Sequence, residues 1–523
     1  MNPTYHVFWG DLHNHNTVGL YDYTRASLER SIDIAQSHLD FFAFTGHAQW
    51  HDMPPMPGGV EKKWTAGFEH HARLWEDTKR QVQEANRPGE FISFIGYEWH
   101  SAAFGDYCLL YKEDGPLAFA DHVRDLQTHV HRCGTGPSGG AAMIPHHLGY
   151  QAGIPGRGVD WDHVDETVSP VVEIFSEHGG CERDRGPFPY TRHSNGARTT
   201  NHTLQHGLAR GLHVGAIASS DNHWAYPGAY GEGLVAILAP ELTRTALWEA
   251  LWQRRCYAVT GERIELDFRL NGHPMGARLR QRGERQMEVA VRAWDEIQRV
   301  EVLKNNRVIY RHFPADHVPG HAESGTGMSA GWSRRDRLRV EFGWGPWAAF
   351  AMPRVADWLG MIELEGARIV DAIPCFQAGP FDEARRSKIL ETTPKRCRWQ
   401  SHTSRSECLD GVPNNAVVLD VEGPPEARCT LRWDKPTQRV HTFTLRHLAQ
   451  TSEIGFTGSF PAESYLIHRL VPDELATACF ACTDGDTDGS RAPEKAREEF
   501  YYVRVFQENG HAAWSSPIWV SAP

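Results

Sequence analysis

The chain carries the stretch Trp9-Gly-Asp-Leu-His-Asn-His-Asn16 directly after a short apolar run that begins at Tyr5. Residues two apart in a strand point to the same face, so His13 and His15 can both turn toward one cation. A neutral imidazole is the commonest protein ligand of transition metals. The stretch therefore predicts one half of a metal site at the end of a strand, and the rest of the chain must supply the other half.

The composition is that of a globular protein with more than one domain. The chain has 523 residues, of which 40% are hydrophobic and 23% are charged, and this length predicts two to four domains. The net charge of -12 argues against nucleic acid as a partner, because phosphate backbones call for basic surfaces. No apolar run approaches the roughly 20 residues that a membrane helix needs.

The termini and cysteines bear on the compartment. The start, Met1-Asn-Pro-Thr-Tyr-His6, lacks the basic and apolar segments of a signal peptide. The 10 cysteines are dispersed, which fits reduced thiols better than a disulfide framework. Cys479 and Cys482 have the spacing of half a zinc site, but no second pair lies near them. We expect a cytoplasmic protein with a small-molecule substrate, no nucleic-acid or membrane partner, and an oligomeric state that the sequence leaves open.

The first half of the chain has an α/β pattern and most of the histidines. Of the 30 histidines, 21 precede residue 263. Short apolar runs alternate there with helical stretches, which is typical of a parallel α/β arrangement. The expected strands are Tyr5–Trp9, Phe41–Thr45, Phe91–Tyr97, Ala141–Pro145, Val171–Phe175, Val214–Ala218 and Leu234–Leu238, and the expected helices are Thr24–Ser37 and Thr243–Arg254. We expect one domain over residues 1–262, with ligand-bearing loops at one end of a barrel.

After residue 262 the pattern becomes β-rich. Runs such as Arg263–Leu270 and Gln286–Ala293 are short and strand-like, and Asn271-Gly272 is a turn signal. Phe500–Phe506 and Ala513–Trp519 predict a closing hairpin. We expect an antiparallel, sandwich-like region over residues 263–523, in one or two domains. Ser324–Arg335 and Ala478–Arg497 are polar or charged and are expected to be loops.

Further candidate ligands lie at or just past the predicted strands of the first half. They are His47, Glu98, His146, His147, Glu173, His178, Asp221 and His223. Histidines and carboxylates gathered in one cleft lose solvation and repel their like charges, which is costly unless they bind something. Divalent metals resolve that conflict, and a shared carboxylate can hold two ions at close spacing.

The motifs that carry these residues resemble an ordered set from a known family. Gly10-Asp-Leu-His-Asn-His15, Phe44-Thr-Gly-His47, Gly96-Tyr-Glu-Trp99, Pro145-His-His147 and Ser220-Asp-Asn-His223 are similar to motifs of the PHP (polymerase and histidinol phosphatase) superfamily. The resemblance spans residues 1–262. Tyr257–Gly261 and the β-rich tail resemble a PHP-related branch with a C-terminal β-domain. The resemblance implies a distorted (β/α)7, TIM-like barrel, two or three divalent ions and hydrolysis of phosphoesters.

The resemblance also implies roles for individual residues. His13, His15, Glu98 and Asp221 would hold one metal; His47 and His223 would hold a second, with Glu98 bridging; His146 or His147, together with His178, would serve a third. The superfamily often has a further histidine soon after His-x-His, for which Asp22 is the nearest substitute here, and its usual Asp before His47 is Gly46. Glu173 matches a position whose ligand role varies. The mixed donors suit zinc, manganese or iron.

Such ions would lower the pKa of a bound water toward roughly 7. His178 could then protonate a leaving group, and His223 could do so if no metal held it. Arg183, Arg185, Arg192 and Arg198 follow His178 and could clamp a phosphate or carboxylate, although a solvated surface loop is an equal alternative.

The remaining aromatic and histidine residues have plainer interpretations. Trp50, Trp99 and Trp224 stand near the proposed ligands and are expected to pack the barrel; if they line its mouth instead, the substrate has a flat or sugar-like part. His70-His71, His129 and His131 lack the context of a strand end, and we expect them on the surface.

Three functional hypotheses follow from the sequence. The first is a metal-dependent phosphoesterase, favoured by the resemblance and the arginine-rich loop. The second is a metallohydrolase of a non-phosphate ester, lactone or amide with an aromatic or sugar-like part. The third is a non-catalytic, metal-stabilised binding protein, against which the nearly full ligand set speaks.

Overall fold

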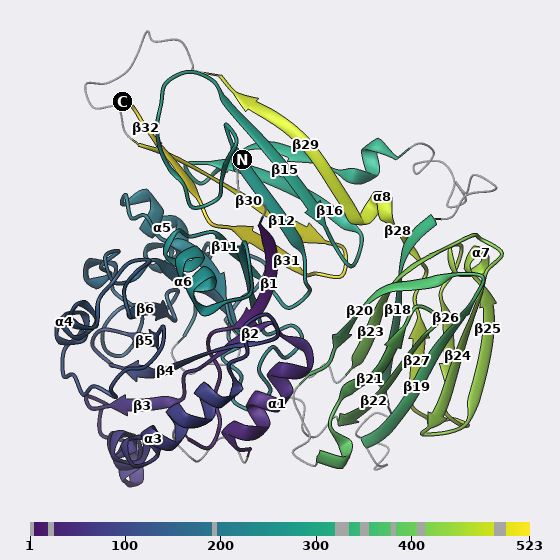
Figure 1. Ribbon diagram of the computed structural model, residues 1–523, viewed down its shortest axis with the longest axis horizontal. Helices are drawn as coiled ribbons and strands as arrows, with labels where there is room; N and C mark the ends of the chain where they lie inside the picture. Colours follow the sequence, from purple (N-terminus) through teal and green to yellow (C-terminus); the bar gives the residue numbers. More distant parts are fainter. Residues whose placement is uncertain are drawn as a thin grey trace.

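The protein is a mixed α/β structure whose longer helices all lie in its first half (Figure 1). The computed structural model describes residues 5–18, 26–190, 196–318, 334–345, 355–377, 383–404, 414–485 and 498–523. The helices are α1 Leu28–His38, α2 Glu61–Thr65, α3 Gly67–Ala85, α4 Val123–Cys133, α5 Leu204–Ala209, α6 Arg244–Trp252, α7 Leu445–Leu448 and α8 Asp473–Ala476. None of the described helices is both long enough and apolar enough to cross a membrane.

The strand that leads into His13 lies in the middle of the largest sheet. This strand, β1 (His6–Asp11), pairs parallel with β2 (Phe41–Phe44) and antiparallel with β10 (Leu234–Ala239). The first-half strands of this sheet run in the order β6-β5-β4-β2-β1-β10-β11, and C-terminal strands continue the sheet beyond β11. Its remaining members in the first half are β3 (His47–Trp50), β4 (Ile92–His100), β5 (Asp106–Tyr111), β6 (Ala141–His146) and β11 (Cys256–Val259).

The wholly parallel arrangement expected for the first half is wrong. Strands β1, β2 and β4 are parallel, but β5 pairs antiparallel with both β4 and β6. The chain between His100 and Asp106 is too short for a parallel crossover, which needs a dozen or more residues. Instead Ser101 and Gly105 exchange backbone hydrogen bonds and reverse the chain tightly.

Two further predicted strands form a separate small sheet beside the large one. β7 (Val171–Ser176) pairs parallel with β9 (Gly215–Ala218) and antiparallel with β8 (Gly179–Gly180). β7 lies next to β6, and β9 lies next to β11, so the strands curve around a common interior. No hydrogen-bonded ring joins all of these strands within the described ranges, so the α/β class is found and the closed barrel stays a prediction.

The predicted helix start at Thr243 is found. The Thr243 hydroxyl accepts a hydrogen bond from the Ala246 amide at 3.2 Å, and α6 begins at Arg244. Such an N-cap satisfies an amide that otherwise lacks a partner in the first turn. α1 starts later than expected because Ser27 caps it.

The second half contains two antiparallel sheets that pack on each other. One has the order β20-β23-β18-β27-β26 and the other β21-β22-β19-β24-β25. Their strands are β18 Arg334–Trp344, β19 Val355–Glu365, β20 Arg368–Cys375, β21 Lys388–Thr393, β22 Arg396–Ser404, β23 Asn415–Gly423, β24 Arg428–Lys435, β25 Arg439–Thr444, β26 Glu453–Phe456 and β27 Ser464–Ile467. Phe342 from one sheet and Trp358, Trp399 and Trp433 from the other share one buried core. This is the sandwich-like packing expected after residue 262.

A segment expected to be a loop is partly a strand. β29 (Thr477–Asp484) pairs along its whole length with β15 (Arg285–Arg292), which also pairs with β12 (Glu265–Leu270). The sequence of β29 has few of the large β-branched residues that are typical of strands. The strand forms because every residue of β29 pairs with β15. The predicted loop over Ser324–Arg335 lies mostly outside the described residues, and β18 begins at its end.

The end of the chain returns to the first half. β30 (Glu499–Gln507) and β31 (Ala512–Ser515) form the predicted antiparallel hairpin. β31 then pairs with β11, so one sheet runs from the first half into the second. β32 (Ile518–Ser521) and β14 (Arg278–Arg280) complete that edge. The C-terminal strands therefore extend the sheet that carries β1.

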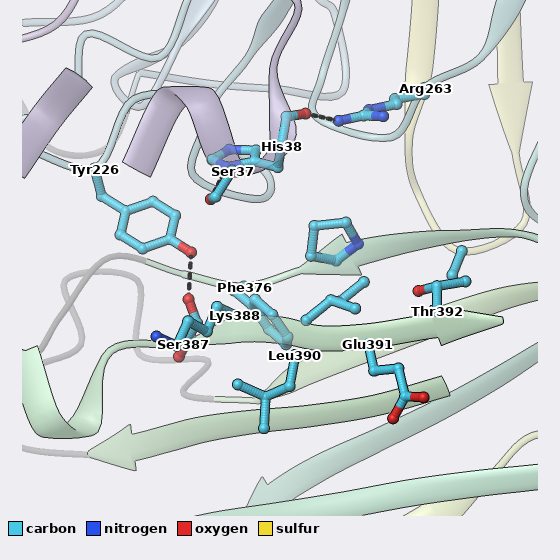
Figure 2. Close-up of a pocket in the computed structure, with 13 residues that line it drawn as sticks. Ser37, His38, Tyr226, Arg263, Phe376, Ser387, Lys388, Leu390, Glu391 and Thr392 are labelled. Atoms are coloured by element: carbon cyan, nitrogen blue, oxygen red, sulfur yellow. Dashed lines mark hydrogen bonds between the residues drawn. The ribbon is translucent and has the colours of Figure 1, made fainter. Parts of the chain in front are cut away.

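A cavity of about 320 Å³ lies at the seam between the two halves (Figure 2). It is lined by α1 residues such as His38 and by β21 residues such as Lys388. The Tyr226 hydroxyl donates to the Ser387 carbonyl across this seam at 3.2 Å, and the Arg263 guanidinium donates to the His38 carbonyl. The sandwich therefore contacts the loop after β9, to which Tyr226 belongs.

A histidine between two half-buried carboxylates, one of which precedes β30, predicts a pH-dependent stability. The His213 ring lies between Glu166 (Nδ1 to Oε2, 3.1 Å) and Glu498 (Nε2 to Oε2, 2.6 Å). Burial lowers the pKa of His213, but the two carboxylates outweigh it and raise that pKa above 6.5. Hydrogen bonding to His213 lowers the pKa of Glu166 to about 2. The contribution of His213 to the free energy of unfolding is therefore complete below its unfolded pKa of 6.5. This contribution is lost as the pH rises through the raised pKa of the folded state.

We therefore expect His213→Gln to destabilise the protein more at about pH 5.5 than at about pH 9. Urea unfolding at both pH values measures the difference, with a Gln substitution at the exposed His273 as the control. Equal destabilisation at the two pH values would contradict the assignment.

Candidate metal centre

Histidines and carboxylates from six strands and their ends meet in one buried cluster. His13 and His15 follow β1, His47 begins β3, Glu98 lies in β4 and Asp221 follows β9. The exposed fractions of His13, Glu98 and Asp221 are each 1%. The two loops are held together by backbone hydrogen bonds from Asp221 to His13 (2.8 Å) and from His15 to Asn222 (3.0 Å). The fold thus fixes the His-x-His segment against the Asp-x-His segment.

Four imidazole nitrogens surround one oxygen of Glu98. Glu98 Oε2 lies 3.3 Å from His47 Nε2, 3.4 Å from His13 Nε2, 3.4 Å from His100 Nε2 and 3.6 Å from His15 Nε2. These separations exceed those of good N–H···O hydrogen bonds. Within the described residues, Glu98 Oε2 and the Nε2 atoms of His13 and His100 have no hydrogen-bond partner. Leaving buried polar atoms in this state is costly, and a cation between them would satisfy them together.

Asp221 forms a second centre of the cluster. Its Oδ1 lies 2.7 Å from His15 Nε2 and 3.3 Å from His13 Nε2. Its Oδ2 lies 2.9 Å from His178 Nε2 and 3.1 Å from His146 Nε2. Asp221 therefore links the His-x-His pair to the histidines that follow β6 and β7.

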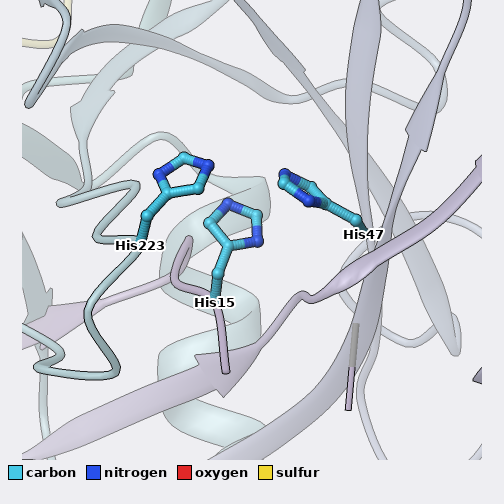
Figure 3. Close-up of side chains that lie close together, drawn as sticks. All are labelled: His15, His47 and His223. Carbon is cyan, nitrogen blue, oxygen red and sulfur yellow. The ribbon is translucent and has the colours of Figure 1, made fainter. Parts of the chain in front are cut away.

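The rings of His15, His47 and His223 come from three separate segments and face a shared space (Figure 3). One nitrogen from each ring lies within 4.8 Å of the others. The His15 and His223 rings are stacked with centroids 4.3 Å apart. The structure thus places His47 and His223, which were expected to hold the second ion, beside His15, which was expected to hold the first.

A set of carboxylates lies behind the rings. Glu173 contacts His146 Nδ1 (2.6 Å) and His13 Nδ1 (3.2 Å), which leaves both Nε2 atoms directed at Asp221. Glu177 contacts His223 Nδ1 at 2.6 Å. Metal-bound histidines commonly donate their other N–H to a carboxylate, which fixes the ring orientation. These contacts favour an orienting role for Glu173 over the ligand role considered from the sequence.

We expect Glu173→Gln to weaken metal binding about 10- to 100-fold without abolishing it, because it removes the charge behind two rings. Calorimetric titration with Mn²⁺ measures the change. A variant that bound no ion at all would instead indicate that Glu173 is itself a ligand. Glu166→Gln, at a carboxylate whose ring partner is His213, provides the control.

The charges in the cluster shift the pKa values in opposite directions. Burial disfavours ionised Asp221 and Glu98, but the surrounding imidazoles outweigh it and hold the pKa of each carboxyl well below its usual range. Burial and the neighbouring His223 lower the pKa of His15 to about 4. Burial and His15 likewise lower the pKa of His47. His15 and His47 are therefore neutral at physiological pH, which is the form that binds metals.

Two of the arginines after His178 contact their own loop. Arg183 Nε lies 3.5 Å from Glu182 Oε2, and Arg185 is exposed. Arg198 donates to the carbonyls of Gly180, Gly186 and Phe188 and thereby holds its own loop together. Asp22 and Arg192 lie outside the described residues. These contacts fit the surface-loop alternative better than a substrate clamp.

Some surrounding residues differ from the sequence interpretation. His71, expected on the surface, is fully buried on the inner face of α3, where its ring contacts Phe44 and Trp75. The prediction for His71 was wrong because His71 lies on the face of α3 that packs against β3 and β4. Trp99 packs in the interior, as expected, with its indole N–H donating to the Ala120 carbonyl. Trp50 is also buried and stacks on His100.

The sequence interpretation missed His100 and its neighbour Asp106. His100 is two residues after Glu98 in the same strand, so the two side chains share a face. This is the spacing that singled out His13 and His15, and it could have identified His100. Asp106 lies 3.2 Å from His100 Nδ1 but comes from the unexpected strand β5.

Comparison with known proteins gives distant likenesses. No family model matches the chain. It is 30% identical over 175 residues to an uncharacterised protein of Chlamydia pneumoniae and 29% identical over 174 residues to one of Chlamydia muridarum. Each match covers 30% of this chain and 28% of the relative, so the chain spans under a third of the length of these curated relatives.

Among solved structures, the chain is similar to a two-domain protein from Bacteroides vulgatus that contains a predicted PHP-like metal-dependent phosphoesterase. The sequence identity is 14%, the TM-score is 0.33, and the alignment covers 57% of this chain and 79% of that one. The chemistry of the cluster therefore has to be judged from its own geometry.

Proposed function

We propose that this protein is a divalent-metal-dependent hydrolase, and specifically a phosphoesterase. The observation that carries the proposal is the set of four imidazole nitrogens within 3.3 to 3.6 Å of Glu98 Oε2. Imidazoles around a buried carboxylate form a donor set suited to zinc, manganese or iron.

The cluster offers ligands for more than one ion. His13, His15, Glu98 and Asp221 would hold one, and His47 and His223 would hold a second with Glu98 shared. His146, His147 and His178 would serve a third. Bound ions of this kind supply a hydroxide nucleophile at neutral pH and polarise the oxygen of the group under attack.

The chain's own residues would manage the protons. His178 Nε2 lies 2.9 Å from Asp221 Oδ2, and its exposed fraction of 7% places it at the edge of the buried cluster. From this position His178 can give a proton to a leaving group. His223 is more exposed, and its Nδ1 lies 2.6 Å from Glu177 Oε1. Burial opposes the charged form of His223, but Glu177 and Asp221 outweigh it and raise its pKa to about 9, so His223 is an alternative acid only if it does not hold the second ion.

A second candidate function is hydrolysis of a non-phosphate ester, lactone or amide. The observation that favours it is aromatic: the Trp64 ring lies 5.6 Å from the His47 ring and 5.4 Å from the Trp50 ring. Such surfaces suit a flat or sugar-like group. The arginines of the loop after His178, which would favour phosphate, make their described contacts elsewhere.

Hydrolysis assays on three generic substrates separate these alternatives. The purified protein, stripped and then reloaded with Mn²⁺ or Zn²⁺, is tested on p-nitrophenyl phosphate, bis(p-nitrophenyl) phosphate and p-nitrophenyl acetate. Metal-dependent cleavage of a phosphate ester supports the proposal, and cleavage of the acetate alone supports the second candidate. Metal binding without hydrolysis of any substrate would refute both and leave the binding-protein hypothesis.

A further inference from the structure

Trp50, His100, Asp106 and Arg157 form a closed ring of side chains next to Glu98. Asp106 contacts His100 on one side (Oδ1 to Nδ1, 3.2 Å) and Arg157 on the other (Oδ2 to Nη2, 2.7 Å). The Arg157 guanidinium carbon lies 4.4 Å from the centre of the Trp50 ring. Trp50 in turn stacks on His100, with centroids 5.3 Å apart and an angle of 26° between the planes. Each side chain in this ring therefore contacts the next, and the last contacts the first.

This ring is buried and carries charge. The exposed fractions are 8% for Trp50, 2% for His100, 0% for Asp106 and 9% for Arg157. A carboxylate removed from water in this way requires a counter-charge, which Arg157 provides. The Trp50 ring keeps the guanidinium in place through a cation–π contact. The arrangement places the Asp106 carboxyl group directly behind His100.

His100 is placed as a metal ligand would be. Its Nδ1 faces Asp106, and its Nε2 lies 3.4 Å from Glu98 Oε2, the oxygen that His47 Nε2 approaches to 3.3 Å. In the described part of the chain, neither ring nitrogen of His100 has a hydrogen bond of good geometry. A buried imidazole without such bonds is costly. A carboxylate on Nδ1 and a free direction at Nε2 are the marks of a carboxylate–histidine–metal arrangement.

A purely structural role for the Asp106–Arg157 pair explains fewer of these contacts than a shared cation does. Such a pair explains the burial of the two charges, but it requires no imidazole between the carboxylate and Glu98. It also leaves unexplained why His47, Glu98 and His100 place their ligand atoms within 4.8 Å of one another. A shared cation explains both features.

We propose that His100 is a ligand of the ion held by His47 and Glu98, and that Asp106 and Arg157 are positioning residues that set the affinity for this ion. The inference rests on the proposed function, since it assumes that the cluster binds metal. His100 would supply the donor that the sequence lacks in the segment after His13 and His15. The additional ligand of the second ion would then come from the end of β4, as His100, and not from the loop after β1.

Metal counting on matched variants tests the inference without relying on activity. The variants are His100→Gln, Asp106→Asn and Arg157→Met, with Arg157→Lys as the conservative replacement. The control is His131→Gln, which breaks a surface histidine–carboxylate pair (His131 Nε2 to Asp165 Oδ2, 3.7 Å). Each protein is titrated with Mn²⁺ under electron paramagnetic resonance, which distinguishes single ions from coupled pairs, and thermal unfolding of the metal-free proteins checks the fold.

We expect the wild type and the control to bind at least two ions with a coupled signal. His100→Gln should lose the coupled signal while one ion stays bound with unchanged affinity. Asp106→Asn and Arg157→Met should weaken the binding of the ion that His47, Glu98 and His100 hold by about 10- to 100-fold, and Arg157→Lys should weaken it less.

Three results would overturn the inference. They are a coupled signal of wild-type affinity in His100→Gln, equal weakening of all ions in Asp106→Asn and Arg157→Met, and absence of bound Mn²⁺ in the wild type. If His100→Gln does not fold, the Asp106 and Arg157 variants decide the question. Failure of the proposed function looks different: the wild type would bind its ions and show the variant effects while hydrolysing no substrate.

Discussion

Asp221→Asn is expected to remove the hydrolytic activity, with a loss of at least about 100-fold in kcat/KM, since even residues behind the ligands typically cost 10- to 100-fold. Asp221 Oδ1 contacts His13 and His15, and its Oδ2 contacts His146 and His178. Asparagine keeps the size of the side chain but removes its charge and one acceptor oxygen. The substitution therefore removes the anion that joins the two sides of the cluster.

Steady-state kinetics on the best substrate, together with the metal content of the purified variant, measure this effect. Asp165→Asn is the matched control, because Asp165 also faces a histidine but lies on the surface. Wild-type kcat/KM in the Asp221 variant would show that the reaction takes place elsewhere.

Arg504→Met is expected to cost about 3 to 5 kcal/mol of unfolding free energy. Arg504, in β30, has an exposed fraction of 4% and contacts Glu182 (Nη1 to Oε1, 3.0 Å) and Glu301 (Nε to Oε2, 2.5 Å). Its removal takes away the only fully buried counter-charge that the described residues provide for these two carboxylates and leaves Glu182 with Arg183, and Glu301 with Arg299 and Arg311, which are more exposed. Because Glu182 belongs to the loop that follows His178, the loss also loosens that edge of the metal centre.

Urea unfolding measures the cost, and Arg311→Met is the control. Arg311 contacts the same Glu301 at 2.9 Å, but its side chain is 53% exposed, so we expect its loss to cost less than about 1 kcal/mol. If Arg504→Met and Arg311→Met had equal free energies of unfolding, the contact of Arg504 in β30 with Glu182 would not stabilise the first half of the chain.

The candidate metal centre could be predicted from the sequence because its residues sit at strand ends. Strand identity depends on local apolar runs, and the runs before His13, His47, His146 and Asp221 were long enough to recognise. Chemically distinctive residues after each run then point to one interior. The relative positions of the rings could not be predicted, because they depend on pairings between strands far apart in the chain.

The errors have an equally physical origin. His100 could not be placed on the strand from the sequence, because the predicted strand ends at Tyr97 whereas β4 continues to His100. Asp106 could not be placed without β5, whose antiparallel pairing contradicts a purely parallel pattern. The sequence left a clamp and a surface loop as alternatives for the arginines after His178, and in the structure Arg198 donates to carbonyls of its own loop. Charge can be read from a sequence, whereas the direction of a long side chain cannot.

The most direct test of the metal centre is anomalous diffraction from crystals of the protein soaked with Mn²⁺ or Zn²⁺. The structure predicts strong peaks between Glu98 Oε2 and the Nε2 atoms of the surrounding histidines, with a ligand contact to Asp221. Maps without a peak at Glu98 and Asp221, or with peaks only at surface histidines, would contradict the account.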